Sequence, residues 1–199
     1  MPQKSQNNNS DALLPKLTLC LAKIAEVIHW CLAAVMLVGA VLAITQPAPF
    51  VELVKNAVSQ NGVNLSCYGF EIVATNPSGE PRFNMLLIFT LGSFIILSLM
   101  AMIFRNIYLI LKTTQGKTWF AKGETPFQQN IVRMFREIGI FFIATSAMSL
   151  ISEIIVNITG GELISGFNYL NCFIGLVFLC VSQFFNYGTR LEKDLDGLV

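Results

Sequence analysis

Four long apolar windows, nearly free of charge, alternate along the chain with polar segments into which the charges crowd. The windows predict helices over residues 24–45, 85–111, 138–158 and 167–188. About 20 apolar residues of helix cross a hydrocarbon core of about 30 Å, whereas a buried helix of a soluble domain more often stops after about 10–14 residues. The pattern therefore predicts an all-α integral membrane protein with four transmembrane helices, in one domain over residues 13–188.

Composition supports this class. Of the 199 residues, 54% are hydrophobic and only 13% are charged, whereas a soluble domain carries roughly 25% charged residues. The first window is preceded by about 23 residues and is longer than the apolar core of a signal peptide, which favours a retained helix over a cleaved leader. The polar segment over residues 1–12 is expected to be disordered.

Lysine and arginine counts predict the orientation, because short cytoplasmic connections carry an excess of both. The connection over residues 112–137 is basic, and the segments before the first and after the last helix also carry lysine or arginine. The segment over 46–84 is more acidic than basic, and the one after the third helix contains only Glu162. Both termini, the connection 112–137 and the tail 189–199 are thus predicted to be cytoplasmic.

The outer loop, residues 46–84, is long enough to have a structure of its own. The sequence after Pro49 predicts a short amphipathic helix that uses Val51, Val54 and Val58. The stretch "LSCYGFEIVATNPSGEPRF" predicts short strands around an Asn-Pro-Ser-Gly turn. We expect this loop to cover the outer ends of the helices as a lid, and a ligand-binding cap is the alternative.

The stretch "GETPFQQNIVRMFREIG" has the signals of a helix start, since Thr125 fits an N-cap and Pro126 the first helical position. A helix from here to Asn157 would be roughly 48 Å long, so its first turns must lie outside a core of about 30 Å. These turns are amphipathic and carry Arg133 and Arg136. They predict either an anchor that packs on its own protein or a docking surface for a partner.

Polar residues inside the windows are candidates for function. Thr145, Ser149 and Glu153 recur every fourth residue, which predicts a seam between helices, with Asn168 and Asn171 as hydrogen-bonding partners. The alternative is a cation or proton site at Glu153. His29, the only histidine, is expected to pack at the membrane interface. No metal-ligand cluster, cofactor motif or nucleic-acid-binding motif is evident, and a Cys67–Cys172 disulfide is left open.

Two stretches resemble a known family. "GETPFQQNIVRMFREIG" and "FFNYGTRLEKDLDGLV" are similar to segments of the bacterial domain-of-unknown-function family 2975, small four-helix membrane proteins. The family has no settled biochemical activity, but its members are often encoded beside a small helix-turn-helix regulator. The resemblance implies a cytoplasmic interaction surface, which we assign to the following positions: Phe127, Asn130, Arg133, Arg136, Tyr187, Gly188 and Asp194.

These observations predict a non-enzymatic protein of the bacterial inner membrane that binds a cytoplasmic regulator and no nucleic acid directly. The alternative is a small transporter or channel with Glu153 in its path, and a homo-oligomer is compatible with either. An enzyme would need a convergent set of histidine, cysteine or carboxylate side chains, which the sequence does not present.

Overall fold

A computed structural model describes residues 8–57, 64–76, 79–119, 128–161, 163–165 and 167–196. The long helices are α1 (Asn8–Thr45), α3 (Phe83–Thr114), α4 (Gln129–Ile158) and α5 (Tyr169–Asp196), with a short helix α2 (Pro47–Ala57) after α1. Three strands complete the fold: β1 (Asn64–Cys67), β2 (Phe70–Val73) and β3 (Leu163–Ser165). All four long helices are long and apolar enough to cross a membrane, as the sequence predicted.

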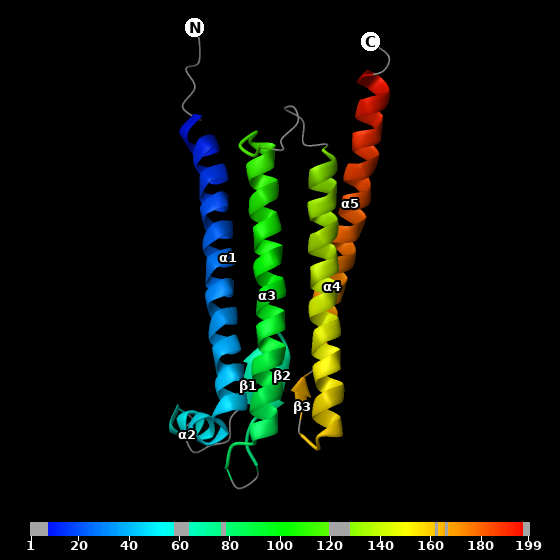
Figure 1. Ribbon diagram of the computed structural model, residues 1–199. Helices are drawn as coiled ribbons and strands as arrows, with labels where there is room; N and C mark the ends of the chain where they lie inside the picture. Colours follow the sequence, from blue (N-terminus) through cyan, green and yellow to red (C-terminus); the bar gives the residue numbers. More distant parts are fainter. Residues whose placement is uncertain are drawn as a thin grey trace.

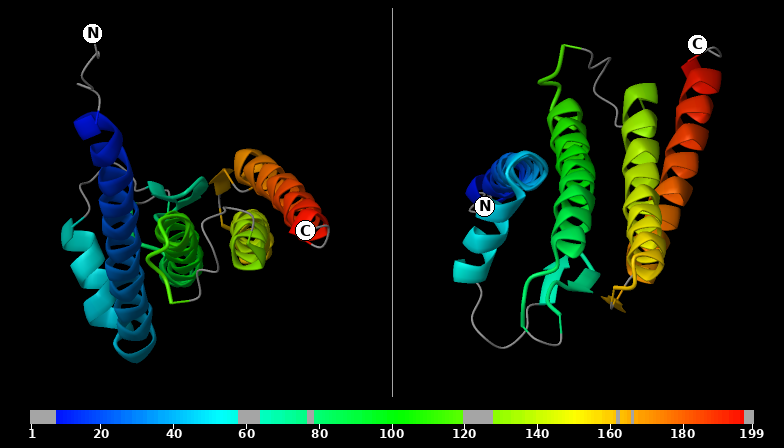
Figure 2. Two further views of the ribbon diagram at one scale, coloured as in Figure 1. Left: turned by 90° about the horizontal axis from the view of Figure 1, so that it is seen from above. Right: turned by 60° about the horizontal axis from the view of Figure 1, so that its bottom comes forward.

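The long helices stand side by side in a single curved layer, in the order α1, α3, α4, α5 (Figures 1 and 2). Each packs against the next one along the chain, so α1 and α5 form the two edges. Both ends of the described chain lie at one end of the layer, which we call the terminal end. The distal end, opposite to it, carries α2 (Figure 1).

The helix limits have local causes. Gly160 follows α4 with a φ of 68°, a left-handed conformation that ends helices because glycine has no Cβ to clash. Asn168 caps α5, since its Oδ1 accepts a hydrogen bond from the amide of Asn171 at 3.1 Å. α1 already begins at Asn8, so residues 8–12, predicted to be disordered, are helical. The predicted cap at Thr125 and Pro126 lies outside the described residues.

The strands form an antiparallel sheet of order β1-β2-β3 on one face of the layer, against α3 and α4. Strands and a helix were predicted for this region, and α2 confirms the helix. The predicted Asn-Pro-Ser-Gly turn is present, since the Gly79 amide donates to the Asn76 carbonyl at 2.8 Å and Thr75 pairs with Pro81. The turn at Tyr68 and Gly69, which joins β1 and β2, was not predicted, and neither was β3.

Only part of the outer loop lies at the helix ends, as a lid would: α2 is at the distal end, whereas the hairpin of β1 and β2 extends along the helices (Figure 1). Phe70 and Ile72 are fully buried and pack with Met85, Phe89 and Ile96 of α3. Phe70 reaches Gly92, where a Cβ would lie 3.3 Å from its ring. Gly92 is nine residues into α3, so by helix rise the hairpin reaches about 14 Å along that helix.

α5 is displaced toward the terminal end. Near its start, the Asn171 side chain donates to Thr145 Oγ1 of α4 at 3.3 Å. Thr145 lies about 20 Å from the distal end of α4 by helix rise. The segment with β3 therefore covers the distal part of α4, and α5 continues past the terminal end of α4 as helix up to Asp196. The predicted span 167–188 is thus displaced relative to the other three, and most of the predicted tail is helical.

Candidate functional site

Two faces of α5, one mixed and one apolar, have the same alternating spacing of three and four residues, which is typical of helices that pack on other helices. One face packs on α4 and is buried or half-buried: Asn171, Gly175, Phe178, Ser182, Phe185 and Thr189. The other face points away from the layer and is exposed: Phe173, Val177, Cys180, Phe184, Tyr187 and Leu191. The second face has no partner helix within the described part of the chain.

The last part of this exposed face lies beyond the apolar stretch of α4. Gly175 and Gly139 are level with each other, since a Cβ on either would lie 2.8 Å from the carbonyl oxygen of the other. Leu191 is 16 residues further along α5, about 24 Å by helix rise. We call Phe184, Tyr187 and Leu191 the α5 stripe; their exposed fractions are 75%, 64% and 46%.

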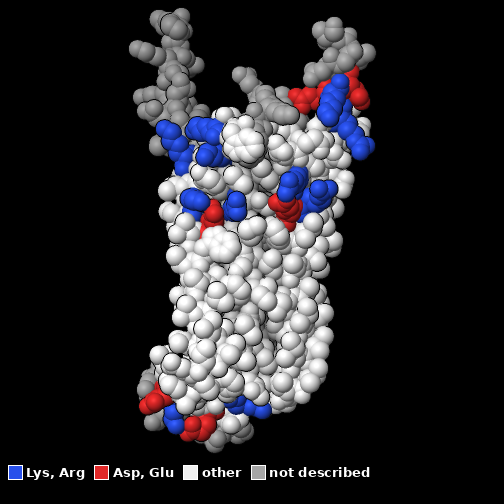
Figure 3. All heavy atoms as spheres, in the orientation of Figure 1, with Lys and Arg blue, Asp and Glu red and all other residues white. Residues whose placement is uncertain are grey.

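Charge marks the boundary of the apolar part. Figure 3 shows a broad uncharged band between charges at the distal end and a belt of charges toward the terminal end. On α4 this belt contains Arg133, Arg136 and Glu137, directly before the apolar run from Ile138, which only Glu153 interrupts. Since Ile138–Ile158 is about 30 Å long, this run fits a hydrocarbon core, and the α5 stripe would lie outside such a core.

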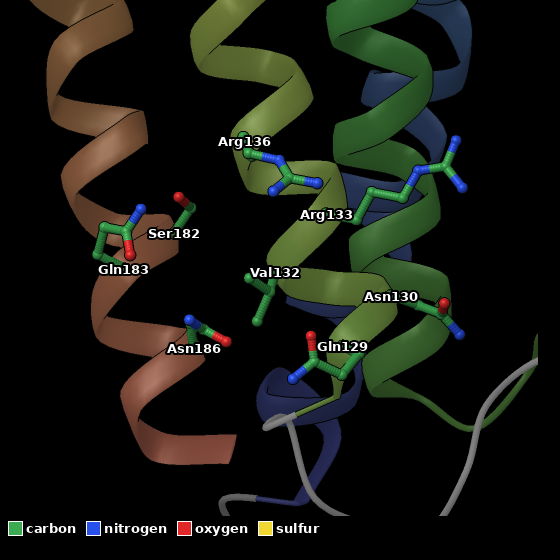
Figure 4. A pocket seen from close by; sticks show the side chains of 8 residues that line it. All are labelled: Gln129, Asn130, Val132, Arg133, Arg136, Ser182, Gln183 and Asn186. Carbon is green, nitrogen blue, oxygen red and sulfur yellow. The ribbon is translucent and has the colours of Figure 1, made fainter. Parts of the chain in front are cut away.

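A polar hollow of about 300 Å³ lies between the first turns of α4 and the facing part of α5 (Figure 4). In Figure 4, the side of α4 toward α5 carries Gln129 and Val132, and Arg136 lies across the front of the helix. The side chains of Arg133 and Asn130 extend toward α3. Ser182, Gln183 and Asn186 line the hollow from α5. Among the residues that the structure describes, the lining contains two arginines and four carboxamides and no acidic residue.

The two arginines differ in their surroundings. Arg133 Nε donates to Glu137 Oε1 at 2.7 Å, and the buried Asn106 of α3 donates to the other oxygen of Glu137 at 3.2 Å. Arg136 makes no ion pair with a described acidic residue. The hollow therefore holds a net positive charge, to which the nearby N-terminus of α4 adds a partial positive charge.

A second hollow, of about 280 Å³, lies on the other side of α4 and is lined by Trp119, Asn130, Arg133 and Met134. Trp119, just beyond α3, is 95% exposed. Asn130 and Arg133 thus border both hollows.

The structure brings three of the predicted interaction residues together, since Asn130, Arg133 and Arg136 line the hollows. Tyr187 and Asp194 are exposed on another face of α5, and Gly188 is half-buried; none of these three lines a hollow. Phe127 lies outside the described residues. Phe184, Gln183 and Asn186 were missed in the sequence, although the alternating spacing through Phe184, Tyr187 and Leu191 was available as a signal.

No protein-family model, curated protein or solved structure matches this chain. The resemblance to family 2975 therefore stays a hypothesis.

The polar residues of α4 form a seam with α5 and the segment before it. Thr145 and Ser149 are buried; Thr145 Oγ1 accepts from Asn171, and Ser149 donates back to the Thr145 carbonyl at 3.1 Å. Ser146 donates to the carbonyl of Asn168 at 2.8 Å, so both predicted asparagines do take part. Glu153, nearer the distal end, is half-buried and pairs with no described lysine or arginine.

The tip of the hairpin connects three parts of the layer. Tyr68 (φ 49°) and Gly69 (φ 86°) form a two-residue turn with both residues left-handed, which is rare for tyrosine. The Tyr68 carbonyl accepts from the Asn168 side chain at 3.1 Å, and its hydroxyl contacts Nε2 of the buried His29. Cys67 and Cys172 are free thiols, so the disulfide considered from the sequence is not formed.

His29 makes contacts through both ring nitrogens. Its Nδ1 lies 2.7 Å from the Ala25 carbonyl, which can only accept, so Nδ1 carries a proton. Its Nε2 contacts the Tyr68 hydroxyl. Because His29 is about 24 Å from the end of α1 by helix rise, this contact links the tip of the hairpin to a point near the middle of α1.

Removal of the Tyr68 hydroxyl is expected to destabilise the protein. In Tyr68→Phe the Nε2 atom of the buried His29 loses the hydroxyl that it contacts, and a buried polar atom without a partner costs about 1–3 kcal/mol of stability. Thermal unfolding in detergent should show a lower Tm than for Tyr169→Phe, which changes an exposed tyrosine at the start of α5. Equal Tm values would mean that the Tyr68–His29 bond contributes nothing.

Proposed function

We propose that this chain is a non-enzymatic, multi-pass protein of the bacterial cytoplasmic membrane that binds a cytoplasmic regulator at its terminal end. Both termini then lie in the cytoplasm, in agreement with the lysine and arginine counts. The observation that carries the proposal is the α5 stripe: three large apolar side chains, exposed on a helix that extends past the terminal end of α4.

The stripe supports a helix as its ligand. Outside the core no lipid chains cover Phe184, Tyr187 and Leu191, and exposure of such a row to water is unfavourable. Their spacing fits the apolar face of one amphipathic helix. Arg190 and Lys193 flank the row and favour acidic residues along the edges of that partner helix.

The resemblance to family 2975 supplies the kind of partner, a small helix-turn-helix regulator encoded beside the gene. The hairpin suggests how binding would respond to the outer side. It joins α1 through His29 and the start of α5 through Asn168, so a displacement of the hairpin would shift α5 and its stripe. That shift would change how tightly the stripe holds the regulator at the membrane.

Transport through the protein receives less support. The described long helices stand in one layer instead of surrounding a route, and Glu153 lies near the distal end of that layer.

The docking proposal is tested with the purified neighbouring regulator and vesicles that contain the full chain. Inside-out vesicles should bind it, and right-side-out vesicles should not. Phe184→Gln with Tyr187→Gln should weaken binding about thirtyfold or more, since each central aromatic of an interface contributes about 2 kcal/mol or more.

The control is Leu53→Gln, which changes an equally exposed apolar residue on α2 at the distal end and should leave binding unchanged. Binding that survives the double substitution would remove the α5 stripe as the docking surface. Capture of the regulator by right-side-out vesicles alone would overturn the orientation. Disulfide cross-links between two copies of a Phe184→Cys variant, without regulator binding, would identify a homodimer instead.

A further inference from the structure

We infer that the hollow between α4 and α5 binds the phosphate group of an anionic phospholipid from the leaflet at the terminal end. The hollow is lined by Arg136, Arg133 and four carboxamides, and its volume of about 300 Å³ is at the lower limit of small-ligand pockets. This site is separate from the α5 stripe, which occupies another face of α5.

The chemistry of the lining suits a phosphodiester. Guanidinium groups donate paired hydrogen bonds to phosphate oxygens, and carboxamide N–H groups add neutral donors. Arg136 has no described acidic partner and lies across the front of α4 beside the hollow, whereas Arg133, paired with Glu137 through its Nε, extends toward α3 (Figure 4). Among the described lining residues, Arg136 and the carboxamides thus offer charge and donors to an anion, and none of these residues is acidic.

The depth of the hollow favours a lipid over a soluble anion. Arg136 and Arg133 lie about 3 and 8 Å beyond Ile138, by helix rise. With a core of about 30 Å and a total bilayer thickness of about 40–45 Å, the headgroup layer is roughly 5–7 Å thick on each side. Arg136 therefore lies within the headgroup layer, where lipid phosphates are concentrated, and Arg133 lies at its outer edge.

The test measures the retention of phosphatidylglycerol by the full chain, with native mass spectrometry after release from phosphatidylcholine–phosphatidylglycerol nanodiscs. Arg136→Gln should weaken retention about tenfold, because it removes charge-assisted hydrogen bonds to the phosphate that general attraction to the anionic surface does not supply. Gln183→Ala, a second change in the lining, should weaken it also. The control is Arg105→Gln, because Arg105 is an exposed arginine of α3 outside the hollow.

Equal losses in Arg136→Gln and Arg105→Gln would overturn the site, since they would show general attraction to the anionic surface. Unchanged retention in both lining variants would overturn it as well. Inorganic phosphate and a glutamate-rich peptide are then added to nanodiscs of phosphatidylcholine alone. The Tm of the chain is measured with each of them and with phosphatidylglycerol. If either soluble anion raises the Tm as much as the lipid does, and does so only when Arg136 is present, the lipid is overturned as the ligand. A rise with the lipid only would support it.

Discussion

Substitution of Gly175 by leucine is expected to separate α5 from α4 and to unfold this edge of the layer. A Cβ at Gly175 would lie 2.8 Å from the Gly139 carbonyl oxygen and 2.7 Å from Ile143 Cγ1. Contacts this short cannot be relieved by rotating one flexible side chain, because a backbone atom is among them. Close helix approach through small residues is a main source of helix association in lipid, so its loss should be large.

We expect Gly175→Ala to cost at least the ~1–3 kcal/mol of an overpacked core, and Gly175→Leu to cost more. Thermal unfolding of the purified chain in detergent measures both. Gly39→Ala is the matched control: Gly39 also lies within a long helix, but a Cβ there would meet only Thr90 Cγ2 at 3.6 Å and Phe50 Cε2 at 3.9 Å. If Gly175→Ala were as stable as Gly39→Ala, the close contact of α4 with α5 would be wrong.

Truncation of Phe70 is expected to release the hairpin from the helix layer. Its side chain is fully buried among residues of α3 and α4, including Met85 and Val156, and its ring stacks on Phe89 at 6.0 Å between centroids. Phe70→Ala removes this contact and leaves a cavity, which costs about 3–5 kcal/mol in a well-packed core. Because the hairpin holds Tyr68 against His29, the same change should loosen that contact.

Two measurements report this release. The Tm should fall well below that of Phe173→Ala, which truncates an exposed phenylalanine of α5. In a background that keeps Cys67 as the one cysteine, its alkylation by a maleimide should accelerate in Phe70→Ala, since Cys67 lies in β1 beside the tip. Unchanged alkylation together with an unchanged Tm would show that the hairpin does not depend on Phe70.

The residues of the hollow differ in how far the sequence could predict them. Arg133 and Arg136 were assigned to an interaction surface because they lie on amphipathic turns outside the predicted core, in a stretch that resembles family 2975. Gln183 and Asn186 were not, because their role depends on the pairing of α4 with α5. That pairing runs through Gly139 and Gly175, which are 36 positions apart in the chain and form no local motif.

The sequence by itself determined that there are four long apolar helices and approximately where three of them enter the core. Helix length and the absence of charge are local properties, and hydropathy records them directly. Only the tertiary structure decided the order of the helices in one layer, the displacement of α5 and the position of the hairpin beside α3. Lipid chains and a protein interior are equally apolar, so a segment such as Phe70–Val73 has the same pattern in either environment. Which surface covers it depends on contacts between residues far apart in the chain.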